Sequence, residues 1–600
     1  MEHTNSRRAE VTVVLVAAAI YLISVLAPPH LMDDVDAVQA TIAKNMLSSG
    51  DWVTARLDGV KYLEKSPLVY WMMATSFAIF GVTDWAARLP IVLSILALCW
   101  VTFRMGRWAF GELVGLYAGL AMATSIGLFL FTRILIPDVI LTLTIALALW
   151  GFLRALDEEE THPRRWAWLM GASIGTGLLL KGLIAALFPV AAAGLFLLFT
   201  RELWARRTWQ RLYPLSTLAI LLAIALPWHV MATLRNPPYF DWTMKSEPGH
   251  YRGFFWFYFL NEHVFRFLNM RFPRDYNTVP RYSFWMLHLV WFFPWSGWIG
   301  ETFRLDYRAT GRASRTRLLC LCWVGFTMLF FTLSTTQEYY SMPAYPAMTL
   351  LLGSAIASSR SEWPARIAGG ISALALVAIL FILSQVWSLA SPGDISQALA
   401  TQDSEAYTLS LGHIGDLTLR SFAYLRGPLV MAGLALLLGT WGAWLLRGQK
   451  RLLVLAGMMV LFLNAARWAM VTFDPYLSSQ PLAQALKQLP PGKVIIDNQY
   501  YTSSSVFFYA PVNRALLLNG RVNNLEYGSN ETGAPKVFLT DAELPAVWRS
   551  SARYYLFIEN SAVERLRTIL GADLHLVKTI GGKSIYTNGP PPNFSQIRTP

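Results

Sequence analysis

The chain has 600 residues, of which 54% are apolar and only 14% are charged, with 24 Trp and a formal net charge of +13. Soluble proteins average about a quarter charged residues, so this composition excludes an ordinary soluble globular protein. The positive charge does not indicate nucleic-acid binding, because the arginines lie in short connections between apolar runs. Repeated apolar runs of about 20 residues instead predict an all-α, polytopic membrane protein.

The chain starts with a basic segment followed by an apolar run. Arg7 and Arg8 precede the run at 11–27. A cleaved signal peptide has the same pattern, but an uncleaved anchor is favoured because the sidedness of all later connections requires this span. The N-terminus is then cytoplasmic, and the next segment lies on the outer face.

A polar stretch follows at 32–67. Three carboxylates, Asp33, Asp34 and Asp36, stand at its start, and Glu64 and Lys65 stand near its end. Acids at the end of a membrane helix are costly to keep near hydrocarbon, which points to chemistry or metal binding. The alternative is a solvated loop with ordinary surface charges.

The next apolar run, 68–82, is about 15 residues long and therefore short for a membrane span. We predict a helix at the membrane interface on the outer face, because a crossing here would turn every later arginine-rich connection outward. Including 11–27, thirteen spans are expected; the others are 88–104, 112–131, 137–153, 166–180, 183–200, 213–231, 284–302, 318–334, 343–358, 367–389, 427–446 and 452–471.

The distribution of basic residues supports this topology. The short outer connections at 132–136, 181–182 and 335–342 contain two basic residues, Arg133 and Lys181. The predicted cytoplasmic connections are rich in arginine, as expected for the inner side of a membrane. They are 104–111, 154–165, 201–212, 303–317, 359–366 and 447–451.

Two domains are predicted, a membrane domain at 1–472 and a soluble domain at 473–600. The membrane domain has long outer segments at 28–87, 232–283 and 390–426. The soluble domain alternates strand-like runs with helical ones, which indicates a small α/β fold on the outer, periplasmic side. The strand-like runs are Val494–Asp497, Val537–Thr540, Tyr554–Ile558 and His575–Ile580.

Further unusual polar residues fall on the same outer side. Asp138 starts a span after Pro137, where it either caps the helix or takes part in chemistry. Arg133 lies five residues earlier, and Lys181 interrupts the run GLLLKGLIAALF. A lysine in such a place either extends to the membrane surface or binds an anion.

The outer segment 232–283 contains NEHVFRFLN, with His263 and Arg266. A lone histidine is a weak indication of a metal site. Cations beside carboxylates at a membrane surface suggest a phosphorylated lipid as substrate. Lys65, Lys181 and Arg266, with Arg133 as a further candidate, are predicted to bind its phosphate.

Several motifs occur in an order that resembles the GT-C membrane glycosyltransferases of the protein-mannosyltransferase clan. The resemblance is greatest to their bacterial branch, which includes the lipid A aminoarabinose transferase. Within residues 30–350 the motifs are Asp34 with IAKNMLSSGDW, GVKYLEKSPLVYW, DWAARLP, FTRILIPD, LLLKG, FYFLNEHVFRF and STTQEYYSMPAYP.

The resemblance implies a transferase of the bacterial inner membrane that takes a sugar from a polyprenyl-phosphate donor, such as undecaprenyl phosphate. The acceptor would be a lipid A-like lipid or a protein at the periplasmic face. It implies a catalytic carboxylate in the first outer segment, with Asp138 as the second acid. It also implies that Lys65 binds the donor phosphate and that Glu64 and His263 hold a divalent metal, zinc in the aminoarabinose branch.

Two departures from the family pattern stand out. The family has adjacent Asp-Glu where this chain has Asp33-Asp34-Val35-Asp36, so the catalytic acid is either Asp34 or Asp36, with Asp34 preferred. Ser66 replaces the proline of the aminoarabinose branch, which leaves the sugar and the acceptor open.

Two other classes of function compete with the transferase. A transporter or flippase of a lipid-linked sugar would place acids or broken helices near the membrane midplane, whereas here the acids lie at span ends on one side. A non-catalytic scaffold leaves the polar residues of the outer side without a role.

Overall fold

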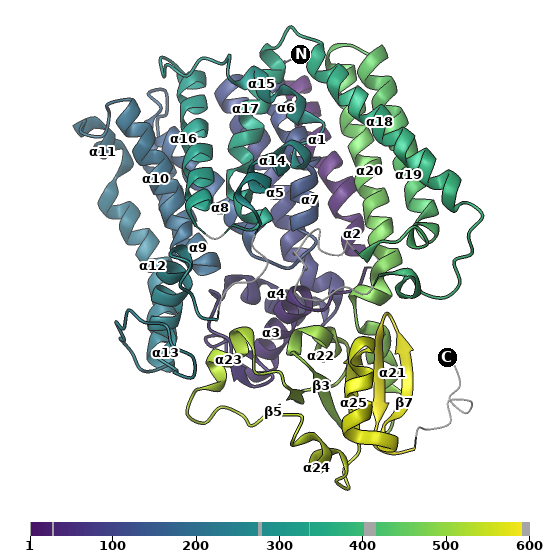
Figure 1. Cartoon of the computed structure of the whole chain (residues 1–600). Helices are drawn as coiled ribbons and strands as arrows, with labels where there is room; N and C mark the ends of the chain where they lie inside the picture. The colour runs from purple at the N-terminus through teal and green to yellow at the C-terminus, as the bar shows by residue number, and fades with distance from the viewer. Residues whose placement is uncertain (1, 27–28, 274–278, 335, 401–415, 591–600) are drawn as a thin grey trace.

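The structure is a computed structural model that describes residues 2–26, 29–273, 279–334, 336–400 and 416–590. Residues 274–278, 335 and 401–415 belong to the predicted outer segments 232–283, 335–342 and 390–426, and they lie outside the described residues. A bundle of long helices forms most of the molecule, and a smaller α/β domain lies at one end of it (Figure 1).

Each of the thirteen predicted spans coincides with a helix or a pair of helices. The continuous helices are α5 (Asp84–Phe110), α8 (Asp138–Leu156), α9 (Pro163–Lys181), α10 (Ile184–Phe199), α12 (Pro214–Arg235), α16 (Arg312–Leu333), α17 (Tyr345–Ser358), α18 (Trp363–Val386), α19 (Arg426–Leu445) and α20 (Gly448–Leu477). Three predicted spans are interrupted: α1 (Glu2–Tyr21) with α2 (Ile23–Leu26), α6 (Glu112–Ala123) with α7 (Ile126–Phe131), and α14 (Arg281–Trp291) with α15 (Ile299–Thr302).

Seven helices of the described chain are long and apolar enough to cross a membrane. A membrane protein with several apolar helices is thereby confirmed, and the number of thirteen spans stays a prediction. The short helices α11 (Arg206–Leu212) and α15 lie at the end of the bundle opposite the α/β domain (Figure 1). The arginine-rich connections next to them are thus far from the acidic first segment, as the sequence predicts.

The first outer segment folds between the bundle and the α/β domain. Helix α3 (Val35–Ser49) ends at Gly50, whose φ of 72° is a conformation that favours glycine. A hairpin of β1 (Arg56–Leu57) and β2 (Val60–Lys61) follows, with the left-handed pair Asp58 and Gly59 in its turn. Helix α4 (Leu68–Phe80) has 13 residues, which is too short to cross a membrane.

The α/β domain has one six-stranded sheet in the order β5-β4-β3-β6-β8-β7. The strands β3, β4, β5 and β6 run parallel, and β8 pairs antiparallel with both β6 and β7. The strands are β3 (Lys493–Asp497), β4 (Ala515–Leu518), β5 (Phe538–Leu539), β6 (Tyr554–Glu559), β7 (His575–Ile580) and β8 (Lys583–Thr587). The helices are α21 (Gln480–Lys487), α22 (Ser505–Tyr509), α23 (Asn523–Ser529), α24 (Leu544–Trp548) and α25 (Val563–Leu570).

This sheet confirms the predicted α/β fold, including all four predicted strands. The strands β4 and β8 were not predicted, because four or five residues between turns give little periodicity. Helix α20 continues to Leu477, past the predicted boundary at 472/473, which stays a prediction.

Candidate active site

A cavity of about 370 Å³ opens where the first outer segment meets α8, α9, α10 and α16. One side is polar and includes Glu64, Lys65, Asp138, Lys181 and Arg266. The apolar part of the lining, here called the apolar wall, consists of Ile184, Leu187, Val264, Phe267, Phe330 and Phe331. All five polar residues were predicted as site residues from the sequence, and the fold brings them together from positions 64 to 266.

Lys181 and Asp138 form an ion pair at the polar side of the cavity. Lys181 Nζ lies 2.5 Å from Asp138 Oδ1, and the Asp138 side chain is 2% exposed. The lysine also lies over the rings of Tyr339 and Tyr340, at 5.0 and 5.2 Å from their centroids. Asp138 therefore does more than cap α8, because it orients a cation of the cavity.

Glu64 and Lys65 form a second ion pair, with Lys65 Nζ 2.5 Å from Glu64 Oε1. Tyr62 donates a hydrogen bond of 2.8 Å to Glu64 Oε2. Burial favours the neutral carboxyl, but the charges of Lys65, Arg271 and Arg266 outweigh it and hold the pKa of Glu64 well below its usual range. Glu64 is therefore an anion that fixes the cations around it.

The third cation of the cavity comes from the outer segment 232–283. A π-helix, η1 (Trp256–Phe265), contains Glu262 and His263, and Arg266 follows it directly. Such wide helical turns are frequent at functional sites. Arg266 lies 3.1 Å from Glu262 and 3.8 Å from Glu64, so two carboxylates orient its guanidinium group.

The donor atoms do not fit the zinc site that the family resemblance implies for Glu64 and His263. His263 Nε2 accepts the N–H of Leu183 at 3.1 Å, and Nδ1 donates to the carbonyl of Tyr258 at 2.5 Å. Burial lowers the pKa of His263 to about 4, so the ring is neutral with both nitrogens engaged. Within the described residues there is no group of three or more His, Cys, Asp or Glu that could hold a metal ion.

Asp33 and Asp34 are both in contact with the α/β domain. Asp33 accepts hydrogen bonds from Lys583 Nζ at 2.6 Å, from Ser479 Oγ at 2.6 Å and from the Ser505 N–H at 2.8 Å. The N–H of Asp34 is held by the Tyr501 carbonyl at 2.9 Å. Burial, with the charge of Asp33 as a second cause, raises the pKa of Asp34 to about 7.

Asp36 has a different environment from Asp34. Its carboxylate accepts the N–H of Leu135 at 2.9 Å and that of Met32 at 3.3 Å, and it lies 3.6 Å from Arg88. The side chain is 1% exposed. Asp36 thus joins the start of α3 to the connection before α8.

Arg133 is not among the described residues that line the cavity. Its guanidinium lies over the ring of Phe129, 4.4 Å from the centroid, and its side chain is buried. Arg133 and Asp138 are close in sequence, but of the two only Asp138 lines the cavity. Its predicted contact with a donor phosphate gains no support from this placement.

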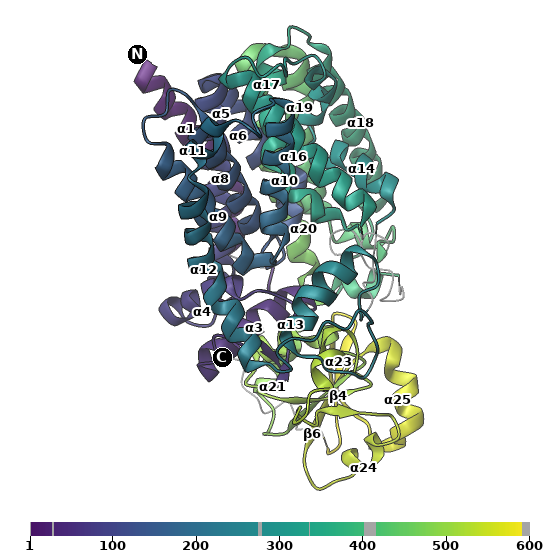
Figure 2. The ribbon, with the colours of Figure 1, turned by 90° about the vertical axis from the view of Figure 1, so that its left-hand side faces the viewer.

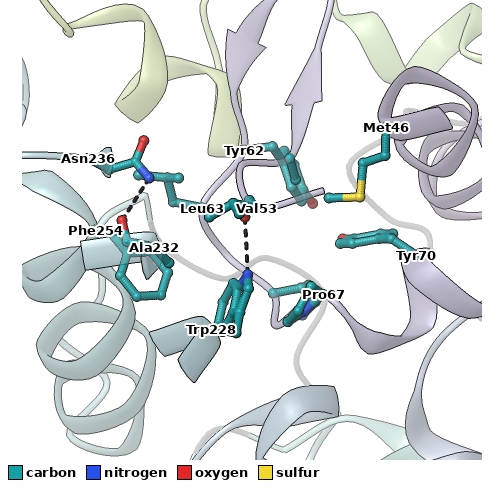
Figure 3. Close-up of a pocket in the computed structure, with 12 residues that line it drawn as sticks. Met46, Val53, Tyr62, Leu63, Pro67, Tyr70, Trp228, Ala232, Asn236 and Phe254 are labelled. Atoms are coloured by element: carbon teal, nitrogen blue, oxygen red, sulfur yellow. Dashed lines mark hydrogen bonds between the residues drawn. The ribbon is translucent and has the colours of Figure 1, made fainter. Parts of the chain in front are cut away.

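A small pocket of about 10 Å³, lined in part by Lys65, has room for no more than a water molecule. Figure 3 shows Tyr62, Leu63, Pro67 and Tyr70 around it, facing Trp228 from α12. Trp228 Nε1 donates to the carbonyl of Val53 at 3.1 Å. This packing holds the Lys65 segment against the bundle.

Several residues that complete the site were not predicted. Ser66 donates to the Leu178 carbonyl at 2.9 Å and is hydrogen-bonded to the Tyr258 hydroxyl, so it ties the Lys65 segment to α9 and η1. Arg271 lies 2.6 Å from Glu262, and Asn524 of the α/β domain donates to Glu64. The spacing along the chain gives no indication of these contacts.

The fold as a whole is that of the GT-C membrane glycosyltransferases. ArnT from Cupriavidus metallidurans in the apo state superposes with a TM-score of 0.76 at 22% identity, over 98% of this chain and 99% of that chain. The structure of the same protein bound to undecaprenyl phosphate gives 0.73 at 21% identity, over 97% of each chain.

The particular branch predicted from the motifs is also confirmed as the one this chain resembles. A family model described as dolichyl-phosphate-mannose-protein mannosyltransferase matches residues 64–230. The chain is 29% identical over 323 residues to undecaprenyl phosphate-alpha-4-amino-4-deoxy-L-arabinose arabinosyl transferase 1 of Sodalis glossinidius, covering 52% of each protein. The corresponding transferase of Pseudomonas aeruginosa (strain LESB58) is 28% identical over 359 residues, which cover 58% of this chain and 60% of that protein. The match thus spans little more than half the length of these relatives.

Proposed function

We propose that this protein is a membrane glycosyltransferase that moves a sugar from a polyprenyl phosphate to an acceptor at the outer face of the bacterial inner membrane. The main observation is the cavity, whose lining combines Lys65, Lys181 and Arg266 with the apolar wall. Three cations suit a phosphate, and apolar side chains suit an isoprenoid chain.

The way in which the cavity opens supports a lipid substrate. Leu187 of the apolar wall is 40% exposed, and the lining residue Leu268 is 51% exposed. In a membrane such side chains meet lipid rather than water. A lipid carrier therefore has a route along α10 to the cations.

The similar proteins support undecaprenyl phosphate as the carrier. The relatives are named as arabinosyl transferases that use an undecaprenyl phosphate-linked amino sugar, and one solved structure of the same fold is bound to undecaprenyl phosphate. A lipid A-like lipid is the first acceptor to test, and a protein is the alternative.

In the proposed reaction the bond between the anomeric carbon and the phosphate oxygen breaks. A bond between that carbon and an acceptor hydroxyl oxygen forms, and the hydroxyl proton passes to a carboxylate. The leaving phosphate gains negative charge, which Lys65, Lys181 and Arg266 stabilise. No step requires a metal at Glu64 and His263.

Neither Asp34 nor Asp36 is among the described residues that line the cavity, and of these two candidate bases Asp34 suits the role better. The pKa of Asp34 is about 7, near the value at which a base is both deprotonated and able to hold a proton. The Asp36 carboxylate already accepts two backbone N–H groups beside Arg88. Asp138 is paired with Lys181 and is assigned to holding that lysine.

The proposed orientation places the N-terminus in the cytoplasm and the α/β domain in the periplasm. It follows from the arginine-rich connections, which lie at the end of the bundle remote from the α/β domain (Figures 1 and 2). Cysteine labelling of intact cells and of broken cells, at one position in each face, tests this orientation.

Sugar transfer by the purified chain from an undecaprenyl phosphate-linked sugar tests the function. We expect turnover in the wild type and a loss of about 100- to 10,000-fold in Asp34→Asn, because a general base contributes that much to the rate. A wild type that moves the lipid-linked sugar across a vesicle membrane without transferring it would instead establish a flippase.

A further inference from the structure

Helix α23 of the α/β domain reaches the polar side of the cavity. Its residue Asn524 donates through Nδ2 to Glu64 Oε2, with the Tyr62 hydroxyl 3.2 Å from the same nitrogen. Asn524 Oδ1 accepts a hydrogen bond of 2.8 Å from Arg271. The neutral Asn524 amide therefore forms hydrogen bonds with an anion, Glu64, and with a cation, Arg271, at the same time.

The contacts around α23 hold this amide in place. The Tyr527 hydroxyl accepts the N–H of Arg252 and donates to the Gly253 carbonyl, both at 2.9 Å. The Tyr527 ring stacks on Phe257 of η1, with centroids 4.0 Å apart. On the other side, a Cβ at Gly528 would lie 2.1 Å from the Lys61 carbonyl, so the helix packs tightly on the β1–β2 hairpin.

The two oxygens of Glu64 have different partners. Oε1 lies 2.5 Å from Lys65 and 3.8 Å from Arg266, the two neighbouring cations that line the cavity. Oε2 accepts from Tyr62 and Asn524, which are neutral. Without these neutral donors, the buried carboxylate would satisfy Oε2 with the same cations and draw them away from the cavity.

We propose that Asn524 is a positioning residue for the donor site: it satisfies Glu64 Oε2 and orients Arg271, which leaves Lys65 and Arg266 turned toward the cavity. The inference rests on the proposed function, because it assigns the cavity to a lipid phosphate. It gives the α/β domain a direct part in donor binding, through a contact between residues 460 positions apart.

Two variants of Asn524 and one control separate this role from a general effect on folding. Asn524→Ala removes the amide. Asn524→Asp keeps the shape and the acceptor for Arg271 but replaces the donor to Glu64 with a like charge. The control is Asn530→Ala, because the Asn530 amide bonds only Arg521 and the Glu526 carbonyl among the described contacts.

The measurement is equilibrium binding of undecaprenyl phosphate to the full chain in nanodiscs, together with the donor KM and kcat. Hydrogen bonds to charged groups contribute about 1.5–3 kcal/mol, so binding should weaken by about 10- to 100-fold in both Asn524 variants. We expect the donor KM to rise by the same factor with a smaller change in kcat, and Asn530→Ala to behave as the wild type.

Wild-type binding in Asn524→Asp would overturn the inference, even if Asn524→Ala fails to fold. If Lys65→Ala and Lys181→Ala weaken binding while both Asn524 variants bind normally, only this inference fails. If neither lysine variant changes binding or turnover, the proposed function itself fails.

Discussion

Lys181 and Asp138 join the end of α9 to the start of α8 through an ion pair of 2.5 Å. The Asp138 side chain is 2% exposed, so the lysine is the partner that compensates for the burial of this carboxylate. The same lysine faces the cavity, where a donor phosphate would meet it. Lys181 is therefore expected to contribute both to the stability of the protein and to donor binding.

Removal of Lys181 alone should both destabilise the protein and weaken donor binding. Lys181→Met leaves Asp138 buried and unpaired, at a cost of about 3 kcal/mol or more. Adding Asp138→Asn removes the unpaired carboxylate. The double variant should therefore melt close to the wild-type temperature, while its donor binding stays weak. Recovery of binding together with stability would show that Lys181 has only a structural role.

The pH dependence of transfer should follow Asp34. Its pKa is raised from 3.8 to about 7 by burial and by the charge of Asp33, so the carboxyl is protonated and inactive as a base below that pH. The rate should rise through a midpoint near pH 7 and level off above it. A profile that is flat between pH 5.5 and 8.5 would contradict this assignment.

The raised pKa of Asp34 also makes the stability of the protein depend on pH. Because the pKa is higher in the folded state, folding favours the protonated carboxyl, and its deprotonation costs stability progressively from pH 3.8 up to about 7. Asp34→Asn should therefore melt at a higher temperature than the wild type at pH 8, and the difference should shrink at pH 5. These melting curves distinguish a buried base from an exposed acid.

The sequence identified most polar residues of the cavity, because each interrupts an apolar run or stands at its end. Lys181 and Asp138 are examples, since a charge at that place is costly unless it is used. Arg133 satisfies the same rule, but its side chain turns toward Phe129. The direction of a side chain in a turn is set by packing, which spacing along the chain does not reveal.

The contacts between the helical bundle and the α/β domain could not be predicted from the sequence, for a different reason. Asn524 is one of many asparagines in polar surroundings, and only the docking of α23 brings it to Glu64. Likewise the break between α6 and α7 falls at Thr124 and Ser125, inside a run that looks like a continuous span. Such features arise from tertiary structure and have no local pattern.

Asp36 should prove to be a structural residue rather than the base. Asp36→Asn weakens the bonds to the Leu135 and Met32 N–H groups and the contact with Arg88, and we expect a loss of about 1–3 kcal/mol in stability. Its kcat should fall far less than that of Asp34→Asn. If Asp36→Asn is stable but inactive while Asp34→Asn transfers sugar normally, the two roles are reversed.

Chelators should leave transfer unchanged. Both ring nitrogens of His263 are hydrogen-bonded, and Glu64 is surrounded by hydrogen-bond donors, so we expect neither to bind zinc. The rate after incubation with EDTA or 1,10-phenanthroline, and the zinc content of the purified chain, check this. A loss of activity that added zinc restores would instead support the metal site that the family resemblance implies.

The apolar wall should determine how tightly the lipid of the donor is held. Leu187 and Leu198 both lie on α10 and are 40% and 54% exposed, and of the two only Leu187 lines the cavity. Burial of a leucine against an isoprenoid chain contributes about 1.5 kcal/mol, so Leu187→Gln should raise the donor KM by roughly 10-fold. Leu198→Gln makes the same chemical change on the same helix and should leave the KM unaltered. Equal effects of both substitutions would mean that the lipid does not follow this wall, and the route of the carrier to Lys65 and Lys181 would have to lie elsewhere.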